Sequence, residues 1–460
     1  MRKHHTTMKP KQLAFPCAVL IVLSVASNAY SQPAPGPGVS LSPLPQVAKR
    51  MRLEDLEQMA LRRNPALSQA AASVRTAEAL RRQAGLYPNP IVGYSGDEIN
   101  PGRVFNYGEH GFFAEQRIVT GGKLGLRRQL AEQDISFVKT EAEAERLRVL
   151  NTVRSLYYQA LGEQRLLSVR TQLARLARRA VQTTSELANV GQADRPDLLA
   201  VDIEAQRLEL GLVQARNALQ RTWRQLAAVT GNPQLEPAQL EGDLEALPKF
   251  DFETELARIY DQSPEVRAAQ VGTTRSELAV RQARASVIPD IIARGGMHYN
   301  RERLETAGQP VGWVGSAEIA VELPIFNRNQ GNIAAARAEA ERATLAVERA
   351  RLALRSRLAS AFREYQDSLA AIERYKNQMI PNAERAYDLY LNSFRQMAAA
   401  YPQVVISQRN LFQLQEDYVS TLVSAWQRAV EIQSLLITAG GEASGHESIR
   451  RDSFQMSAEQ

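Results

Sequence analysis

Residues 313–323 read WVGSAEIAVEL, a stretch in which every second side chain is apolar or small. Alternation with a period of two predicts a strand whose other face carries Glu318 and Glu322. An ordinary surface strand shows the same pattern. A length of about ten residues and an aromatic residue, Trp313, at one end favour a strand that crosses an outer membrane. In that case Glu318 and Glu322 face the lumen of a β-barrel.

This stretch belongs to a predicted β-hairpin at about residues 290–325, and a second hairpin is predicted at about 89–119. The alternation in the first hairpin is only partial, although Tyr94, Phe112 and Phe113 supply aromatic side chains. Two hairpins give four strands, which are too few to close a barrel. Because open strand edges are not tolerated in lipid, membrane-spanning strands here require several chains to share one barrel.

The two hairpins occupy equivalent positions in an internal repeat. Residues 55–95 align with residues 254–294 at a constant offset, so that Pro65 meets Pro264 and Pro90 meets Pro289. Each copy is expected to contain a helix of roughly 30 residues that is stopped by prolines and followed by an extended segment. The predicted organisation is a signal peptide (1–31), a Pro/Gly-rich linker (32–51), a first repeat (52–232), an equatorial linker (233–252), a second repeat (253–438) and a polar disordered tail (439–460).

Long helices are predicted to follow each hairpin. The stretch from Gly122 to Val190 contains no strong helix breaker after its start, and a helix of this length would span roughly 100 Å. The return helix after it has a seam of residues spaced three and four apart, which is typical of a coiled coil: Leu198, Val201, Ala205, Leu208, Leu212, Ala215, Leu219, Thr222, Leu226 and Val229. The outgoing helix of the second copy has a similar seam: Leu358, Ala361, Tyr365, Ser368, Ile372, Tyr375, Met379, Asn382, Ala386 and Leu389.

The N-terminus indicates export. Four basic residues precede an apolar run at 13–26, and small residues follow it, as in a secretory signal. The run is shorter than the ~20 residues of a transmembrane helix. The single cysteine, Cys17, lies inside the run after Ala14, Phe15 and Pro16, a context that does not favour lipid attachment.

Composition argues against nucleic-acid binding and against thiol chemistry. The signal holds four of the 56 Lys and Arg residues and none of the 50 acids, so 52 basic residues remain against 50 acidic ones. A nearly neutral chain offers no general attraction for nucleic acid. Without Cys17 the chain has no cysteine for disulfides or thiolate metal sites.

The sequence contains no recognisable catalytic, cofactor or metal motif. The histidines are His4, His5, His110, His298 and His446, and no two of them have a metal-ligand spacing. His110 and His298 lie near the hairpins, where a solvated or hydrogen-bonded histidine is the simpler interpretation. We therefore predict that the protein is not an enzyme and binds no cofactor.

Acidic residues gather at the predicted tip of the first helical hairpin, at Asp194, Asp197 and Asp202. Aspartate at a helix start accepts backbone N–H bonds and suits the helix dipole. In a symmetric assembly the same residues would form rings of carboxylates that favour cations at a pore mouth. The sequence leaves both interpretations open.

Three stretches carry a resemblance to a known family. They are Gly85-Leu86-Tyr87-Pro88-Asn89-Pro90 before the first strand, Gly121-Gly122-Lys123 at the start of the long helix, and residues 323–332, which read LPIFNRNQGN. With the repeat, they resemble the TolC-type outer membrane factors from about residue 53 to 436. The last stretch is similar to the subgroup that serves cobalt-zinc-cadmium efflux.

The resemblance implies a mainly α protein with a small β part. Three chains would form an α-helical tunnel in the periplasm and a twelve-stranded barrel in the outer membrane, with four strands from each chain. The implied role is a passive exit duct for heavy-metal cations such as Co, Zn, Cd and Ni. A periplasmic adaptor and an inner-membrane pump of the resistance-nodulation-division (RND) class are the implied partners.

Carried onto this sequence, the resemblance also implies residue roles. The periplasmic tip, with its gate and adaptor contacts, comprises Val190, Gly191, Gln192, Asp194, Asp197, Met397, Tyr401 and Pro402. Met397 stands where the family has a glycine. Structural turn residues are Pro90, Gly122, Pro289 and Gly331.

Three other functions are compatible with parts of the pattern. The same type of channel can serve drug efflux or type I secretion. A periplasmic adaptor also has a helical hairpin, although it carries a single one within a β-rich body. A soluble coiled-coil scaffold would not need the alternating strand at 313–323.

Overall fold

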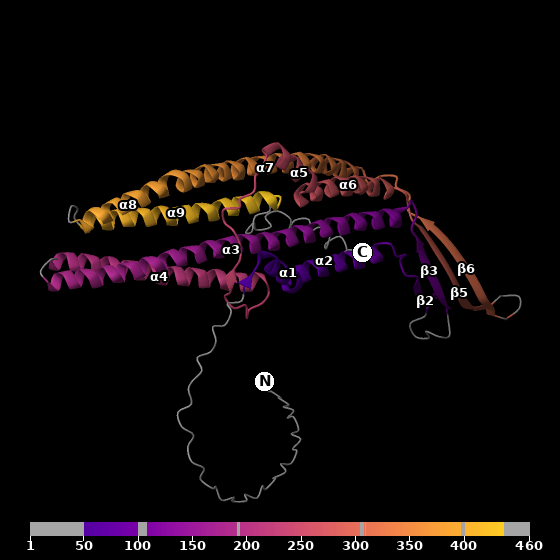
Figure 1. Ribbon diagram of the computed structural model, residues 1–460. Helices are drawn as coiled ribbons and strands as arrows, with labels where there is room; N and C mark the ends of the chain where they lie inside the picture. The colour runs from indigo at the N-terminus through magenta and orange to yellow at the C-terminus, as the bar shows by residue number, and fades with distance from the viewer. Residues whose placement is uncertain are drawn as a thin grey trace, which may run out of the picture. The chain divides into compact units, whose positions relative to one another are not determined.

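The computed structural model describes residues 50–99, 108–190, 194–303, 308, 310–396 and 401–436. The first copy of the repeat contains α1 (Leu53–Arg63), α2 (Pro65–Ala84), β2 (Ile91–Asp97), β3 (Glu109–Ile118), α3 (Lys123–Asn189) and α4 (Arg195–Val229). The second contains α5 (Phe252–Gln262), α6 (Pro264–Ala285), β5 (Ile291–Arg303), β6 (Pro310–Val321), α7 (Gln330–Arg374), the π-helical turn η1 (Tyr375–Met379), α8 (Ile380–Arg395) and α9 (Tyr401–Gln433). Figure 1 shows the strands at one end of the helices.

Each copy begins with two helices where the sequence predicted one. Pro65 and Pro264 lack the N–H that a continuous helix needs, so each begins a new helix instead. The residue before each proline caps the new helix: Asn64 accepts a hydrogen bond from Ala66 N at 2.8 Å, and Ser263 accepts one from Glu265 N at 3.2 Å. Asn64 Nδ2 also donates to Val229 O at 2.7 Å, which satisfies a carbonyl at the end of α4.

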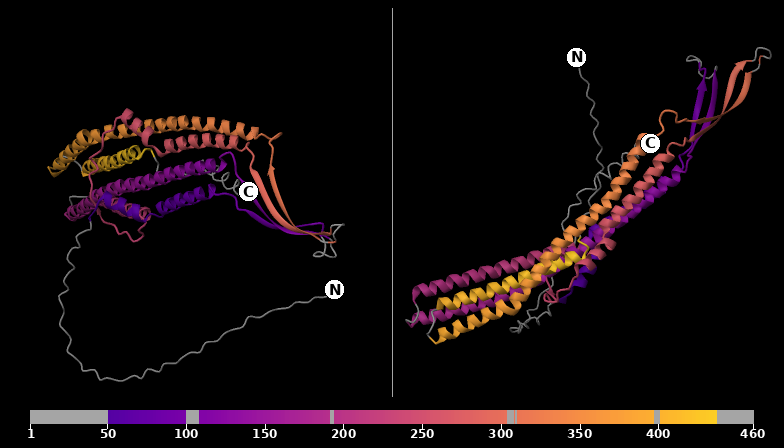
Figure 2. Two further views of the ribbon diagram at one scale, coloured as in Figure 1. Left: turned by 90° about the vertical axis from the view of Figure 1, so that its right-hand side faces the viewer. Right: turned by 90° about the horizontal axis from the view of Figure 1, so that it is seen from above.

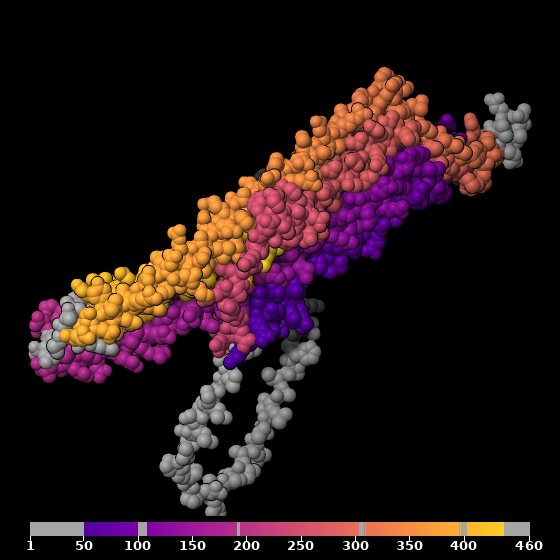
Figure 3. Space-filling view, turned by 45° about the horizontal axis from the view of Figure 1, so that its top comes forward, coloured from indigo at the N-terminus to yellow at the C-terminus, as the bar shows by residue number. Residues whose placement is uncertain are grey.

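The hydrophobic core lies midway along the helices, where both copies contribute to one cluster. Its fully buried side chains come from α1, α3, α4, α5, α6, α7 and α9, and include Leu56, Val153, Leu226, Ile259, Val266, Leu358 and Ile432. Helices α3 and α4 pack along each other, as do α7 and α9 (Figure 1). In the space-filling view α7 and α8 run together along one face (Figure 3).

The linker between the copies is fastened to this core by aromatic side chains. Tyr157 and Tyr365 donate hydrogen bonds from their hydroxyl groups to Glu241 O and Pro248 O, and Trp426 Nε1 donates to Leu244 O at 2.9 Å. Burial raises the pKa of both tyrosines to about 12. A short strand of the linker, β4 (Gln239–Leu240), also pairs in parallel with β1 (Arg50–Met51).

The seam predicted for the first copy is buried or half-buried along its whole length. In the second copy the predicted seam fails after Tyr375, because Met379, Asn382 and Leu389 are exposed. The π-turn η1 contains about one residue more than a regular α-helical turn. Beyond it, the positions that face the core are displaced by about one residue relative to the predicted seam. Pro381 accounts for the insertion, since its ring cannot follow a regular α-turn.

The four longer strands form one antiparallel sheet in the order β2-β3-β5-β6. The central pair, β3 and β5, comes from different copies, with Gly111 opposite His298 and Ile118 opposite Ile291. Gly111 cannot be replaced without a clash, because a Cβ there would lie 2.3 Å from Met297 O. Figure 2 shows the sheet extending away from the helices.

An ion pair joins the two copies where the helices meet the sheet. Lys123 Nζ, at the start of α3, lies 2.8 Å from Asp290 Oδ1, next to the start of β5. The backbone N–H of Thr120 donates to the same oxygen at 3.2 Å. Burial alone would raise the pKa of Asp290, but the hydrogen bonds from Lys123 and Thr120 and the nearby positive charges lower it below its usual value.

Replacing Asn64 should destabilise the protein more than replacing its counterpart Ser263. Ser263→Ala removes one cap, at about 1 kcal/mol. Asn64→Ala removes a cap and also leaves Val229 O without its partner, for a further ~1–3 kcal/mol. Thermal unfolding of the purified variants measures both effects, and equal losses would contradict the second role of Asn64.

Asp290→Asn should lower stability at neutral pH but not in acid. A carboxyl whose pKa is lowered by folding stabilises the protein above the pKa of the unfolded chain, about 4, and this contribution is lost as the pH falls through the folded value. Unfolding temperatures of the wild type and Asp290→Asn should therefore differ at pH 7, and the difference should be smaller at pH 3. Asp261→Asn, at an exposed site on α5, is the control and should match the wild type at both pH values.

Candidate functional site

One face of the sheet is apolar and exposed. Its large side chains are between 43% and 77% exposed in the single chain, and comprise Val92, Tyr94, Phe112, Ile118, Met297, Trp313, Ile319 and Val321. The register places them all on the same side. A contiguous apolar surface of this kind marks contact with a membrane or with another protein.

Aromatic residues mark the end of this face that is farther from the helices. His110, Tyr299 and Trp313 lie opposite one another across β3, β5 and β6, and the rings of Tyr299 and Trp313 meet edge to face at 5.6 Å. Ile118, Ile291 and Val321 form the row nearest the helices. The two rows are separated by eight residues, roughly 26 Å along a strand, which is comparable to the apolar band of an outer-membrane barrel.

The opposite face of the sheet is polar and carries more acids than bases. Its carboxylates are Asp97, Glu109, Glu115 and Glu318, and its guanidinium groups are Arg117 and Arg294. Arg294 lies between Glu115 and Glu318 in register and 3.8 Å above the ring of Phe113. Arg294 can compensate only one of these two glutamates, and Asp97 and Glu109 outnumber Arg117 on the rest of this face.

Of the two predicted strand acids, only Glu318 is placed on the polar face by the register. Glu318 is in β6 opposite Arg294, and Glu322 is the first residue after β6. Both are exposed. That they face a lumen remains a proposal.

A network that the sequence did not reveal lies at the far end of the polar face. His298 Nε2 is 3.1 Å from Glu109 Oε2, and Asn300 Nδ2 donates to Glu109 Oε1 at 2.6 Å. Glu109 comes from the first copy, whereas His298 and Asn300 come from the second. Spacing along the chain could not bring them together, because their contact depends on the β3–β5 register.

The predicted turn residues have different roles in the two copies. Gly122 precedes α3 with a φ of +70°, a left-handed conformation that favours glycine. At the equivalent place before α7, Asn329 has a φ of +57° and Gly331 lies inside the first helical turn. Asn329, not Gly331, therefore forms this turn, and its side chain donates to Ala283 O at 2.8 Å. Pro90 lies just before β2, and Pro289 lies just before β5.

The tips of the helical hairpins are only partly described. Val190 at the end of α3 is 69% exposed, and Asp194 and Asp197 at the start of α4 are exposed. Asp194 occupies the N-cap position, but its side chain makes no capping hydrogen bond. The predicted residues Gly191, Gln192 and Met397 lie outside the described residues, as do the signal and the tail. Tyr401 and Pro402 begin α9.

Ion pairs join the helical hairpin of the first copy (α3 and α4) to helix α9 of the second copy. Arg170 on α3 binds both carboxylate oxygens of Glu416 on α9, at 2.7 and 2.9 Å, and donates to Gly211 O on α4 at 3.1 Å. The hydrogen bond with Glu416 raises the pKa of Arg170. Arg409 on α9 contacts Glu204 on α4 at 2.6 Å.

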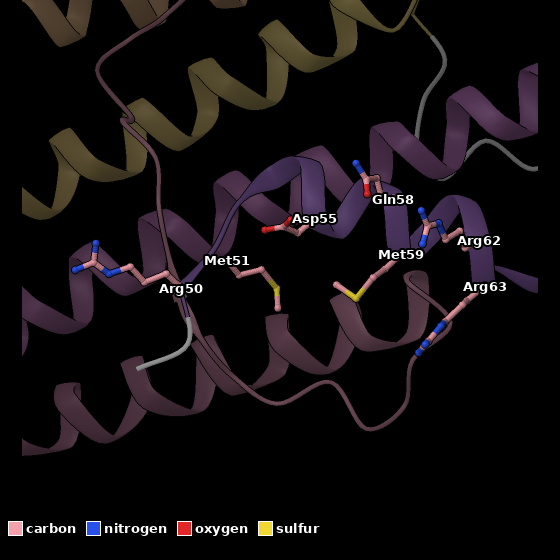
Figure 4. Close-up of a pocket in the computed structure, with 7 residues that line it drawn as sticks. All are labelled: Arg50, Met51, Asp55, Gln58, Met59, Arg62 and Arg63. Atoms are coloured by element: carbon pink, nitrogen blue, oxygen red, sulfur yellow. The ribbon is translucent and has the colours of Figure 1, made fainter. Parts of the chain in front are cut away.

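A pocket of about 400 Å³ lies beside α1 (Figure 4). It is lined by Arg50, Met51, Asp55, Gln58, Met59, Arg62 and Arg63. Three of the seven lining residues are arginines, and Asp55 is the one acidic residue among the seven. In the described part of the chain, no three His, Cys, Asp or Glu residues are disposed to hold a metal ion.

No helix within the described ranges is long and apolar enough to cross a membrane. The sheet and the helical tips, at opposite ends of the helices in Figure 2, are the two candidate functional regions.

Comparisons with known proteins agree with this architecture. The cobalt-zinc-cadmium resistance protein CzcC of Cupriavidus metallidurans is 26% identical over 401 residues, which cover 87% of this chain and 93% of that protein. Protein CyaE of Bordetella pertussis is 26% identical over 364 residues, covering 76% of this chain and 74% of that protein.

Solved structures share the fold at low sequence identity. The CusC channel superposes with a TM-score of 0.71 at 16% identity, covering 84% of this chain and 92% of CusC. The outer-membrane channel OprN gives a TM-score of 0.69 at 19% identity, covering 85% and 90%. The family model described as outer membrane efflux protein matches residues 56–232 and 256–436, one match for each copy of the repeat. This chain belongs to the outer membrane efflux protein family.

Proposed function

We propose that this protein is the outer-membrane duct of a tripartite efflux system, through which substrates leave the cell passively. The two-faced sheet is the observation that carries the proposal. Its apolar face suits lipid and its polar face suits an aqueous lumen. Membership of the efflux protein family supports the same function.

The edges of the sheet support assembly from several copies. In the described chain β2 and β6 each pair with one neighbour only. Unpaired backbone groups are very costly in lipid, so β6 of one copy must pair with β2 of the next. Three copies would give a closed barrel of twelve strands and a tunnel of helices continuous with it. In this arrangement the strands would lie in the outer membrane and the helices in the periplasm.

Partners follow from the same arrangement. A passive duct needs an energy source elsewhere, and an inner-membrane pump of the RND class would supply it. A periplasmic adaptor would contact the hairpin tips around Val190, Asp194 and Asp197. The exposure of these residues is compatible with such contact.

Heavy-metal cations are the proposed cargo. Similarity to the cobalt-zinc-cadmium resistance protein extends over most of both chains. The surplus of carboxylates on the polar face of the sheet also favours cations. Organic compounds are the alternative cargo.

Deletion of the gene should make cells sensitive to zinc, cobalt, cadmium or nickel, because the exit route is lost. Growth at increasing metal concentrations, with and without the gene on a plasmid, measures this. A strain that keeps its metal tolerance but becomes sensitive to dyes or antibiotics would overturn the metal cargo and support organic cargo.

Ile319→Arg should impair assembly in the membrane, because it puts a charge on the lipid face of β6. Arginine costs about 2–4 kcal/mol at the bilayer midplane and about 0–1 kcal/mol at the interfaces, so Ile319, two residues from the row nearest the helices, should fall between these values. The measurement is the amount of protein recovered as an oligomer from outer membranes. Ser316→Arg, on the polar face of the same strand, is the matched control and should assemble normally; equal recovery of both variants would count against a lipid-facing sheet.

A further inference from the structure

We propose that Glu109 and His298 form a transit site for zinc and similar divalent cations on the polar face of the sheet. The inference rests on the proposed function, because it concerns cations that pass through the barrel. It assigns a binding role to two residues from different copies of the repeat.

The geometry of the pair suits a metal ion. Zinc binds histidine nitrogen and carboxylate oxygen at about 2.0–2.2 Å, so two ligands of one ion lie roughly 2.9–3.4 Å apart for octahedral to tetrahedral angles. His298 Nε2 and Glu109 Oε2 are 3.1 Å apart. An ion can therefore bind both atoms with little movement of either strand.

The surroundings hold Glu109 in place and add negative charge. Asn300 Nδ2 donates to Glu109 Oε1 at 2.6 Å, which fixes the carboxylate while Oε2 points to His298. Such hydrogen bonds to metal ligands orient them and tune affinity. Asp97 lies directly opposite Glu109 in the β2–β3 register.

Two carboxylates in directly opposed positions repel each other, and this destabilises a sheet unless a positive charge compensates. In register on this face, the guanidinium group of Arg294 lies opposite Glu115, which is six residues, roughly 20 Å, along β3 from Glu109. Arg294 is therefore too far away to neutralise the pair, and Arg117 lies farther still along β3. Arg301 of β5 lies over the ring of Tyr299, which is on the apolar face. A divalent cation at Glu109 and His298 would do so.

Binding uses the lone pair of His298 Nε2. The ring gives up the Nε2 hydrogen that faces Glu109 and carries its proton on Nδ1, and the Nε2 lone pair then binds the ion. Two protein ligands leave the remaining coordination positions to water. Such a site binds weakly, which suits conduction, since an ion must leave as readily as it enters.

Site-resolved chemical modification tests the proposal on the full-length protein in detergent. Diethyl pyrocarbonate acylates unligated imidazole nitrogen, and mass spectrometry of the peptides reports each histidine separately. Zinc should lower modification of His298 several-fold, whereas magnesium, which prefers oxygen ligands, should not. His110 lies on the apolar face and is the internal control, with unchanged modification. Equal modification of His298 with and without zinc, or equal protection by magnesium, would overturn the site.

Two variants distinguish metal binding by Glu109 from a purely structural role of its hydrogen bonds between the strands. Glu109→Gln keeps a side chain that can hydrogen-bond to Asn300 and His298 but removes the carboxylate, so zinc should no longer protect His298. Glu115→Gln, on the same strand and face, should leave protection intact. Protection that survives Glu109→Gln would contradict the assignment of Glu109 as a ligand.

The results of the metal-tolerance experiment and of the modification experiment distinguish the proposed cargo from the proposed site. If zinc protects His298 but the deletion strain tolerates metals normally, the proposed cargo falls and the site stands. If the deletion strain is metal-sensitive but His298 is not protected, the cargo stands and the site falls.

Discussion

The need to pair backbone groups at the edges of the sheet is the constraint on which the rest of the structure depends. Within the described residues of one chain, the outer strands β2 and β6 each keep one row of N–H and C=O groups without a strand partner. Water can satisfy such an edge, but lipid cannot. Because the apolar face of the same sheet suits lipid, the proposed barrel is complete only when copies of the chain supply the missing neighbours.

Duplication supplies the four strands of the sheet from two copies of one helix–hairpin–helix unit. The two copies differ in several details. Both copies begin with a capped helix pair and contribute one hairpin to the sheet. The first copy then has a single helix of 67 residues, whereas the second is interrupted by a π-turn before Pro381. The turn before the long helix uses Gly122 in the first copy and Asn329 in the second, two residue types that tolerate a left-handed backbone.

Much of this architecture could be predicted from sequence because it depends on local patterns. Alternation at 313–323 indicated β6, and the seam from Leu198 to Val229 indicated the buried face of α4. The break at Pro65 and the phase shift after Tyr375 were missed, because the position of a proline shows where a helix is disturbed but not how the chain adjusts. The Glu109–His298 contact could not be predicted either, since it depends on how strands from two copies align.

The central claim is that one sheet with two open edges is completed by copies of the same chain. Native mass spectrometry of the detergent-solubilised protein from outer membranes tests it most directly. The account predicts a particle of three chains, which supplies twelve strands from four per chain. A stable particle of a single chain would contradict it.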